Sequence, residues 1–460
     1  MKQIVFFTYL ASMSLAFGQN EAGTCFFGNV GVDFRHANPQ IIFPINMVSK
    51  ESPASICDSA GTILFYTNGG NSPTVLNVTG AVWNANHSIM DNGILGDSSG
   101  CLSSYQGSII VPFPSGDQKT NANLYYLFTR DCLESSFTAQ PYNSGLTYAV
   151  IDMNQNGGLG KVVQKNVPVV PYSIATSHMT AHEPVSAIIH GNETDYWLFS
   201  YTNDSLYRMK ITELGITNFT SLVPGKDKIS ISPNRDFLCS GNTVYQFDPF
   251  TGAISFWGIA DQINELTFSP DGSKLYGIEN SSLYQFDVTQ SNFPASKTLI
   301  ASLNQSYRLF LAPNHKIYLF EQNDTDFAGQ IRCPNSSANL CEFSMLPTSL
   351  GGGNTGSDCT NIMAHYLYYS GSCTADIEEE STDIFFQVTP NPAGKWVRIS
   401  TNSTPAVVEI MNLCGATVYS EELIGNELSI NTELFPRGTY FIKLSTHGNY
   451  QVKRLILESQ

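Results

Sequence analysis

The stretch that decides the fold is residues 266–288, LTFSPDGSKLYGIENSSLYQFDV. It contains three short apolar runs, and the turn Ser269-Pro270-Asp271-Gly272 separates the first run from the second. Proline presets φ in such a turn, and glycine accepts a positive φ. The last run alternates apolar and polar residues with the period of a strand. The stretch is therefore predicted to be a three-stranded antiparallel ribbon, which cannot bury its apolar face without neighbouring copies.

Copies of this ribbon occur on both sides of it. Prolines at 233, 270 and 313 each end a short apolar run and precede an aromatic-rich strand. A repeat of about 40 residues built from antiparallel strands is typical of β-propeller blades. Three less regular units precede the proline-marked ones. A seventh is predicted to combine residues 362–369 with strands in residues 26–43, which would remove the open sheet edge. We therefore predict an all-β chain that opens with a seven-bladed propeller over residues 19–373, with six or eight blades as alternatives.

Composition indicates an exported protein of more than one domain. The chain has 460 residues and a net charge of −16, and only 13% of its residues are charged. This acidic balance argues against nucleic acid as a partner. Residues 1–18 are predicted to be a signal peptide, with Lys2, an apolar core and the cleavage-site pattern Ala16-Phe17-Gly18. The apolar core is too short to span a bilayer.

The ten cysteines predict disulfides, because the chain is expected to be exported and contains no C-x-x-C motif. Cys333 and Cys341 flank a short polar loop and are predicted to pair. Cys25 is expected to reach Cys359 or Cys373 and to fasten the closure of the ring. Cys239 and Cys414 are candidates for free thiols. The other six cysteines allow 15 disulfide connectivities. They are Cys25, Cys57, Cys101, Cys132, Cys359 and Cys373.

A second domain is predicted after the propeller. Residues 374–384 are acidic and lead out of the propeller, so they are expected to form an exposed linker. Residues 385–460 contain about seven short strand-like runs. This pattern predicts a small immunoglobulin-like β-sandwich.

Four features of this last segment occur in a specific order. They are the Pro-Asn-Pro opening, a strand that ends in Asn-Leu-x-Gly, the pattern Leu-x-x-x-Gly-x-Tyr, and a terminal strand with a lysine. The segment thereby resembles the C-terminal sorting domain of the type IX secretion pathway of Bacteroidetes. The residues that carry the resemblance are Pro390, Asn391, Pro392, Asn412, Leu413, Gly415, Leu434, Gly438, Tyr440 and Lys453. An ordinary sandwich that serves as a binding module is the alternative.

The resemblance implies a route and a location. The domain would be recognised at the outer membrane by the type IX secretion machinery, after periplasmic passage, and removed by a sortase-like peptidase. The passenger would be released or joined to anionic lipopolysaccharide, and so be secreted or held on the outer cell surface. The N-terminal region is similar to propellers of Bacteroidetes surface proteins with that tail, as in Phe27-Gly28-Asn29 and the run 56–69. This second resemblance implies fold and location and transfers no active site.

No motif predicts a metal, a cofactor or a catalytic residue. Asp152-x-Asn154-x-Asn156-Gly157 imitates the start of an EF-hand loop, but its twelfth position is Val163 and no helices flank it. Residues 323–326 could also offer oxygen ligands. His178 and His182 have zinc-ligand spacing, yet four residues span ~13 Å on a strand. His87 and His190 stand alone, and no G-x-S-x-G elbow occurs.

Two classes of function are compatible with these patterns. The first is an exported binding module for adhesion or for glycan or protein capture, which the low density of histidines and paired carboxylates favours. The alternative is a secreted hydrolase or lyase that acts on a polysaccharide or a small substrate in the axial pocket. Three or four convergent His, Asp or Glu side chains at the channel mouth would favour the enzyme.

Overall fold

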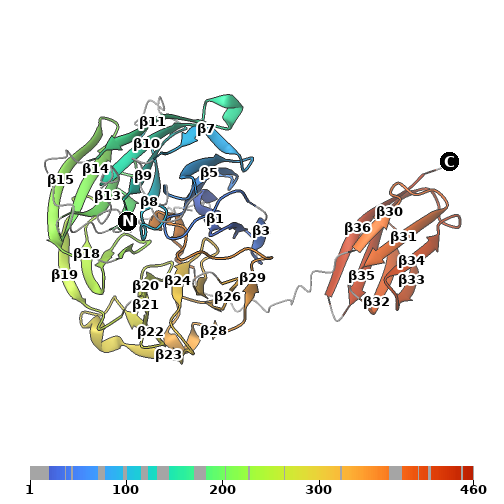
Figure 1. The fold of residues 1–460 in the computed structure, drawn as a ribbon. Coiled ribbons are helices and arrows are strands. Elements are labelled where there is room, and N and C mark those ends of the chain that lie inside the picture. The colour runs from blue at the N-terminus through green and yellow to red at the C-terminus, as the bar shows by residue number, and fades with distance from the viewer. Residues whose placement is uncertain are drawn as a thin grey trace, which may run out of the picture. The chain divides into compact units, whose positions relative to one another are not determined.

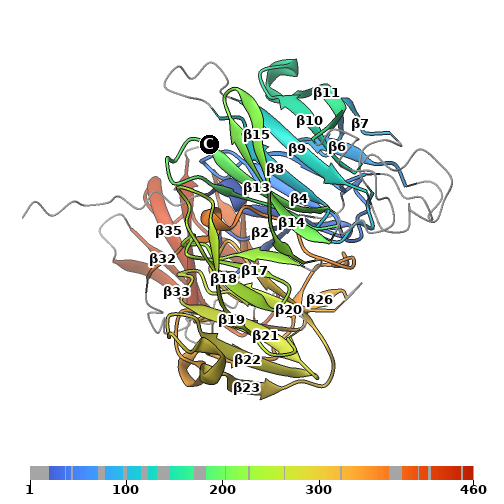
Figure 2. The same cartoon turned by 90° about the vertical axis from the view of Figure 1, so that its left-hand side faces the viewer.

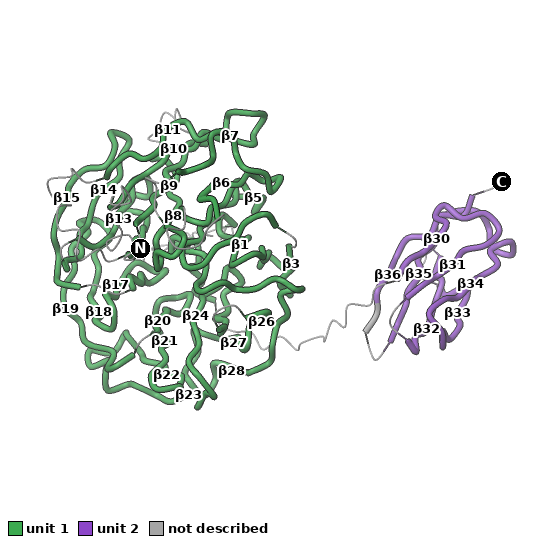
Figure 3. Tube along the Cα trace, viewed as in Figure 1, with its two compact units in different colours: residues 1–373 green, residues 374–460 purple. Residues whose placement is uncertain are grey.

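The computed structural model falls into two compact units, residues 1–373 and 374–460, each of which is described by itself (Figure 3). The structure describes residues 20–458, apart from the following gaps: 37, 43–44, 71–77, 97–100, 115–122, 132–144, 170–182, 203, 226–227, 264, 322–323, 372–385, 402–403, 413–415 and 447–448. The predicted signal peptide and acidic linker lie outside the described residues.

Unit 1 is a ring of antiparallel sheets (Figure 1). A three-stranded sheet comes first, with β1 (Thr24–Phe27), β2 (Val30–Asp33) and β3 (Gln40–Ile42). An eight-stranded sheet follows, made of β4 (Ala54–Cys57), β5 (Ile63–Thr67), β6 (Ala81–Asn84), β7 (Ile89–Ile94), β8 (Ser108–Pro112), β9 (Leu124–Arg130), β10 (Leu146–Asp152) and β11 (Lys161–Pro168).

Four further sheets of four strands complete the ring. They are formed by β12 (Val185–Ile189), β13 (Tyr196–Thr202), β14 (Ser205–Thr212) and β15 (Gly215–Pro224); by β16 (Ile229–Ile231), β17 (Phe237–Ser240), β18 (Thr243–Phe247) and β19 (Ile254–Ile259); by β20 (Glu265–Phe268), β21 (Lys274–Glu279), β22 (Ser282–Asp287) and β23 (Thr298–Ser302); and by β24 (Arg308–Leu311), β25 (Ile317–Phe320), β27 (Gly329–Ile331) and β28 (Phe343–Ser344). A small extra sheet pairs β26 (Asp326–Phe327) with β29 (Thr348–Ser349).

Short 3-10 helices lie between these strands. They are η1 (Asn20–Ala22), η3 (Asn156–Gly158), η4 (Phe293–Ser296), η5 (Ala338–Leu340) and η6 (Ala364–Leu367). Within the residues that the structure describes, no helix is long and apolar enough to cross a membrane.

The predicted ribbon of residues 266–288 is present as β20, β21 and β22 (Figure 2). Its turn is tight, since the backbone N–H of Gly272 donates to the carbonyl of Ser269 (2.9 Å) and Gly272 has a φ of 74°. The sequence missed the fourth strand, β23, which pairs with β22 on the outside of the sheet. The predicted propeller fold is confirmed.

The number of blades depends on how the eight-stranded sheet is divided. Among the described residues, strand pairing between its two four-stranded halves, β4–β7 and β8–β11, is confined to β11 and β7 at Lys161 and Asp91. Division there, with the three-stranded sheet counted as a blade, is compatible with seven blades, and the count stays a prediction. The expectation that residues 362–369 supply a strand of the seventh blade is wrong. That stretch contains η6 instead, and the first three strands form their own sheet.

The end of unit 1 runs along the axis of the ring. We call residues 358–369 the axial segment. Near its start the side-chain amide of Asn361 donates to the carbonyls of Ser108 on β8 (2.9 Å) and Val185 on β12 (2.8 Å). At its end the backbone N–H of Tyr369 donates to Pro270, beyond the end of β20 (3.1 Å). The axis is therefore occupied by the chain itself.

Unit 2 is a two-sheet sandwich. One sheet has the order β30 (Phe386–Thr389), β31 (Trp396–Thr401), β34 (Glu427–Asn431). The other has the order β33 (Thr417–Leu423), β32 (Ala406–Met411), β35 (Gly438–Thr446), β36 (Asn449–Leu457). Alternate residues of both sheets, among them Val397, Ile399, Val408 and Ile442, form one buried core. The predicted small β-sandwich is confirmed.

Candidate functional site

The Pro-Asn-Pro opening of unit 2 is fastened to the last strand by Asn391. Its side-chain amide donates to the carbonyl of Arg454 (2.6 Å), and its Oδ1 accepts from the backbone N–H of Ile456 (2.9 Å). Pro390 and Pro392 are exposed on either side of it. The asparagine of this motif thus has a structural role, because it ties the start of the sandwich to its final strand.

Two further motif residues hold the sandwich together. The hydroxyl of Tyr440 donates to the carbonyl of Pro436 (2.8 Å), and the ring is buried in the core. The ammonium of Lys453 donates to the carbonyl of Phe386 and lies 5.2 Å from the centre of that ring. The tyrosine fixes the loop before β35 and the lysine joins β36 to β30, which explains why both side chains belong to the pattern.

Asn412 also acts locally. Its Oδ1 accepts from the backbone N–H of Ala416 (3.0 Å), which closes the turn between β32 and β33. Leu413 and Gly415 of that turn lie outside the described residues.

Leu434 differs from the other motif residues because its side chain is 89% exposed. It follows β34 in a surface loop, and Gly438, at the start of β35, is exposed as well, with a φ of 148°. A leucine in this position contributes nothing to the core, so its place in the motif has no structural explanation. Four motif residues therefore hold the sandwich together, whereas Leu434 is free to contact another molecule. The four are Asn391, Asn412, Tyr440 and Lys453.

A charged cluster lies at the start of the inner strands of unit 1. Glu265, the first residue of β20, accepts from the ammonium of Lys228 (3.2 Å) and pairs with the guanidinium of Arg308. Lys228 directly precedes β16, and Arg308 opens β24. Successive inner strands lie side by side, so the ring brings these three residues together. Asp358, the first residue of the axial segment, is buried beside them.

Burial and ion pairing act against each other on these groups. Burial alone would raise the pKa of Glu265, but the charges of Lys228 and Arg308 outweigh it, and the pKa lies below its usual value. Burial also opposes the charge of Lys228, and Glu265 outweighs it, so the pKa of Lys228 lies well above its usual value. Burial raises the pKa of Asp358. The glutamate and its two cations therefore remain ionised as a partly self-neutralised group.

Sequence reasoning missed this cluster, although the repeat contains a signal for it. Lys228, Glu265 and Arg308 each stand immediately before the apolar run of a proline-marked unit. Alignment of the three units would have placed one charged residue at the same position of adjacent blades.

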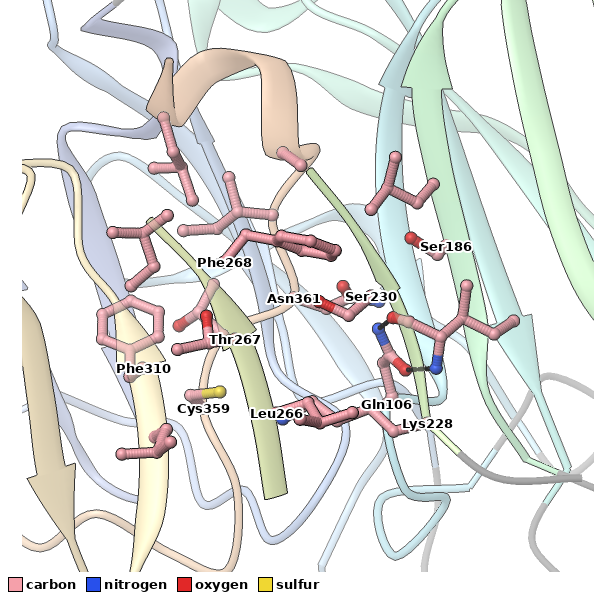
Figure 4. Close-up of a pocket in the computed structure, with 18 of the residues that line it drawn as sticks. Gln106, Ser186, Lys228, Ser230, Leu266, Thr267, Phe268, Phe310, Cys359 and Asn361 are labelled. Atoms are coloured by element: carbon pink, nitrogen blue, oxygen red, sulfur yellow. Dashed lines mark hydrogen bonds between the residues drawn. The ribbon is translucent and has the colours of Figure 1, made fainter. Parts of the chain in front are cut away.

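The cavity beside the axial segment is small (Figure 4). It has a volume of about 100 Å³, and Gln106, Lys228, Phe268, Asp358 and Asn361 are among the residues that line it. Ligand pockets usually measure about 300–1,000 Å³, and a water molecule takes about 30 Å³. The cavity therefore has the volume of a few water molecules and is too small for a sugar chain.

The other sequence candidates are turn or core residues. Asp152 accepts from the backbone N–H of Asn154 (2.9 Å) and from the amide of Gln155 (2.8 Å), as in a hairpin turn. His190 accepts from the backbone N–H of Asn192 (3.0 Å) and packs against Trp197. The described part of the chain contains no group of three or more His, Cys, Asp or Glu side chains that could hold a metal ion. His178 and His182 lie outside it.

The predicted cysteine pairs are wrong. Cys341 is a free thiol whose Sγ donates to the carbonyl of Ala338 (3.2 Å), so it does not bond Cys333. Cys25 is a free thiol buried among the aromatic rings between the first and last sheets, so it forms no disulfide across the closure of the ring. The described free thiols are Cys25, Cys57, Cys239, Cys341 and Cys359.

Two other cysteines carry disulfides. Cys101 and Cys333 are disulfide-bonded, and neither is bonded to one of the five free thiols. Cys132, Cys373 and Cys414 lie outside the described residues.

Fold and tail together define the class: an exported protein in which a β-propeller precedes a C-terminal sorting domain. Residues 387–458 match the family model described as the secretion system C-terminal sorting domain. Such a domain directs secretion to the cell surface or the extracellular space, through the type IX machinery. The predicted sorting domain and location are confirmed.

The comparisons with similar proteins do not assign an activity to this chain. No curated protein matches the chain. The extracellular domain of BT4673 from B. thetaiotaomicron is similar at 11% identity and a TM-score of 0.40, over 95% of this chain and 56% of that one. PorZ of Porphyromonas gingivalis, a surface component of the type IX secretion system, is similar at 10% identity and a TM-score of 0.22, over 95% and 74%. AztD of Citrobacter koseri is similar at 12% identity and a TM-score of 0.38, over 74% of this chain and 87% of that one. TM-scores this low carry no property over to this chain.

Proposed function

We propose that the protein is an exported binding module whose propeller captures a glycan or a protein at the cell surface or outside the cell. A signal peptide at residues 1–18 would deliver it to the periplasm. The type IX machinery would then export it, and a sortase-like peptidase would remove the sorting domain. Attachment of the propeller to anionic lipopolysaccharide would retain it at the surface.

The observation that carries this proposal is the closed axis of the propeller. The axial segment fills the space in which a propeller enzyme would hold its substrate, and the cavity left beside it is about 100 Å³. Among the residues that the structure describes, this arrangement leaves little room for a polysaccharide at the axis and favours ligand binding at the outer surfaces of the propeller.

The charged cluster also supports a binding module over an enzyme. Among the described residues, two carboxylates converge there, Glu265 and Asp358, fewer than the three or four acidic or histidine side chains that would favour an enzyme. Glu265 is engaged by two cations, which hold its pKa low, so it is poorly suited to proton transfer at neutral pH. Its role is to stabilise the ring.

One observation supports the alternative that the protein is a hydrolase or lyase. Burial raises the pKa of Asp358, and a carboxyl with a raised pKa is a common general acid. The small cavity around it weighs against this alternative.

The test uses the full chain, applied to arrays of bacterial and host glycans and to immobilised extracellular proteins. The proposal predicts retention of at least one ligand without chemical change to it. Release of new reducing ends or unsaturated sugars, lost in Asp358→Asn, would refute it in favour of the enzyme. Retention of nothing on either array would also refute it.

A further inference from the structure

A larger cavity lies on the first part of the propeller, away from the axis. Its volume is about 390 Å³, within the usual range for ligand pockets. The described residues that line it are Asn46, Val48, Val78, Thr79, Trp83, His87 and Ile89. They come from the segment between β3 and β4, from the approach to β6, and from the hairpin β6–β7.

Stacked aromatic rings make the floor of this cavity rigid. Trp83 on β6 stacks on Tyr66 with 5.9 Å between ring centres and 11° between planes. Tyr66 in turn stacks on Phe26 at 3.8 Å and 5°. Ile89 lies directly opposite Trp83 on β7, so the two side chains share one face of the sheet. The position of the indole is therefore set by packing before any ligand arrives.

The indole N–H of Trp83 is an unused donor. Trp83 as a whole is only 4% exposed and Nε1 makes no hydrogen bond to a described residue, yet that atom is not sealed from solvent, so it opens toward the cavity that Trp83 lines. In contrast, Nε1 of Trp197 donates to Pro249 (2.8 Å), and Nε1 of Trp257 donates to Val288 (3.0 Å). A buried tryptophan normally finds such a partner. At Trp83 that partner is expected to be a ligand in the cavity.

His87 adds a second polar group. It lies in the β6–β7 turn with a φ of 58°, a conformation that few residues other than glycine adopt. Its Nδ1 is 3.0 Å from the hydroxyl of Tyr66, which leaves Nε2 for a ligand. Burial lowers the pKa of His87, so the ring is neutral at pH 7.

Asn46 and Thr79 complete the polar side. The amide of Asn46 donates to the carbonyl of His87 (3.0 Å), which leaves its Oδ1 as an acceptor. The carbonyl of Thr79 accepts from Asn68 (3.1 Å), and its hydroxyl is left to contact a ligand.

The lining selects against charged ligands. None of the described lining residues is Asp, Glu, Lys or Arg, so an ion would lose hydration without a compensating charge. Val48, Val78 and Ile89 provide apolar walls, while Asn46, Thr79, Trp83 and His87 offer donors and acceptors. Neutral sugars combine apolar C–H faces with hydroxyls that both donate and accept. We propose that this cavity binds one neutral sugar unit of a glycan. This inference rests on the proposed function and assigns a binding site to it.

The test measures binding of methyl glycosides of glucose, galactose, mannose and N-acetylglucosamine to the full chain, by saturation-transfer NMR and calorimetry. Glucuronate serves as the charged contrast. At least one neutral glycoside is expected to bind, and Trp83→Phe is expected to weaken it about 3- to 10-fold, as loss of one hydrogen bond does. The matched control is Trp197→Phe, whose indole is bonded within the protein and which should leave binding unchanged.

A second pair of variants does not depend on the tryptophan. Val48 is exposed at the cavity wall, so Val48→Phe should fold normally and abolish binding by filling the cavity. Ile94→Phe, at an equally exposed residue of β7 that does not line the cavity, should bind like the parent.

The proposal is refuted if none of the neutral glycosides binds, if glucuronate binds better than they do, or if Trp83→Phe and Trp197→Phe behave alike. Capture of a glycan by the full chain that survives Val48→Phe would refute the cavity as the site and leave the binding function standing. Capture of no glycan or protein on the arrays would refute the function itself.

Discussion

Replacement of Glu265 by glutamine tests the role of the charged cluster most sharply. The glutamate is shared by Lys228 and Arg308, and its side chain is 7% exposed. Glutamine keeps the shape of the side chain but removes the negative charge, so two cations are left beside each other in a buried place. Removal of one partner from a buried ion pair costs about 3–5 kcal/mol.

That cost is large relative to the stability of a domain, which is about 5–15 kcal/mol. We expect the free energy of unfolding of unit 1 to fall by this amount in urea titrations at pH 7. Glu193→Gln is the control, because Glu193 pairs with Arg235 at 2.7 Å but is 61% exposed. An exposed pair of this kind contributes about 0–1 kcal/mol. Equal losses in the two variants would refute the account of the cluster.

The pH dependence provides a second readout of the same carboxylate. The folded pKa of Glu265 lies below the ordinary value of 4.5, so its stabilisation is fully present above that value and is lost as the pH falls through the folded pKa. Asp358 acts in the opposite direction, since its pKa is raised. The stability difference between parent and Glu265→Gln should therefore shrink below about pH 4.5. A difference that is constant down to pH 3 would contradict the assignment.

Three further substitutions have expected outcomes. Tyr440→Phe removes the hydroxyl bonded to Pro436 and should cost unit 2 about 0.5–1.5 kcal/mol in thermal unfolding. Leu434→Ala should change stability by less than about 0.5 kcal/mol, because the side chain is 89% exposed, yet lower the exported fraction in cell fractionation. Asn361→Leu leaves the carbonyls of Ser108 and Val185 without their donor and should cost at least about 2 kcal/mol in chemical denaturation. Normal export of Leu434→Ala, or unchanged stability of the other two, would contradict these assignments.

The repeating part of the fold was predictable because its signal is local. Pro270 and Gly272 fix a turn, and β22 buries Leu283 and Phe286 while Ser282, Tyr284 and Asp287 stay partly exposed. The outer strand β23 gave no such signal, since none of its residues is fully buried and the apolar pattern is weak. A strand at the outside of a blade is held by backbone pairing, which any sequence without proline can supply.

The axial segment could not be predicted from the chain. Asn361 acts through carbonyls of β8 and β12, which are far from it in the sequence, and the apolar run after it, residues 362–369, resembles a blade strand although it contains η6. The cavity at Trp83 is equally hidden, because a tryptophan whose N–H lacks a partner looks in sequence like one whose N–H has one. The predicted cysteine pairs are wrong for a related reason, because the spacing of two cysteines in the sequence does not determine the direction of their side chains.

The sequence identified the motif residues of the sorting domain but did not show what each residue does in the structure. Asn391, Tyr440 and Lys453 stabilise the sandwich, whereas Leu434 lies on its surface. Sequence alone treats these residues as equivalent, and only burial and hydrogen bonding separate them.

The account depends most directly on delivery of the propeller by its tail. The deciding measurement is the fraction of protein found in the medium and on the cell surface, by immunoblot of cell fractions, for the full chain and for a chain that ends at Asp376. The account predicts that the full chain is exported and that the truncated chain accumulates in the periplasm as a folded, protease-resistant propeller. Undiminished export of the truncated chain would contradict it.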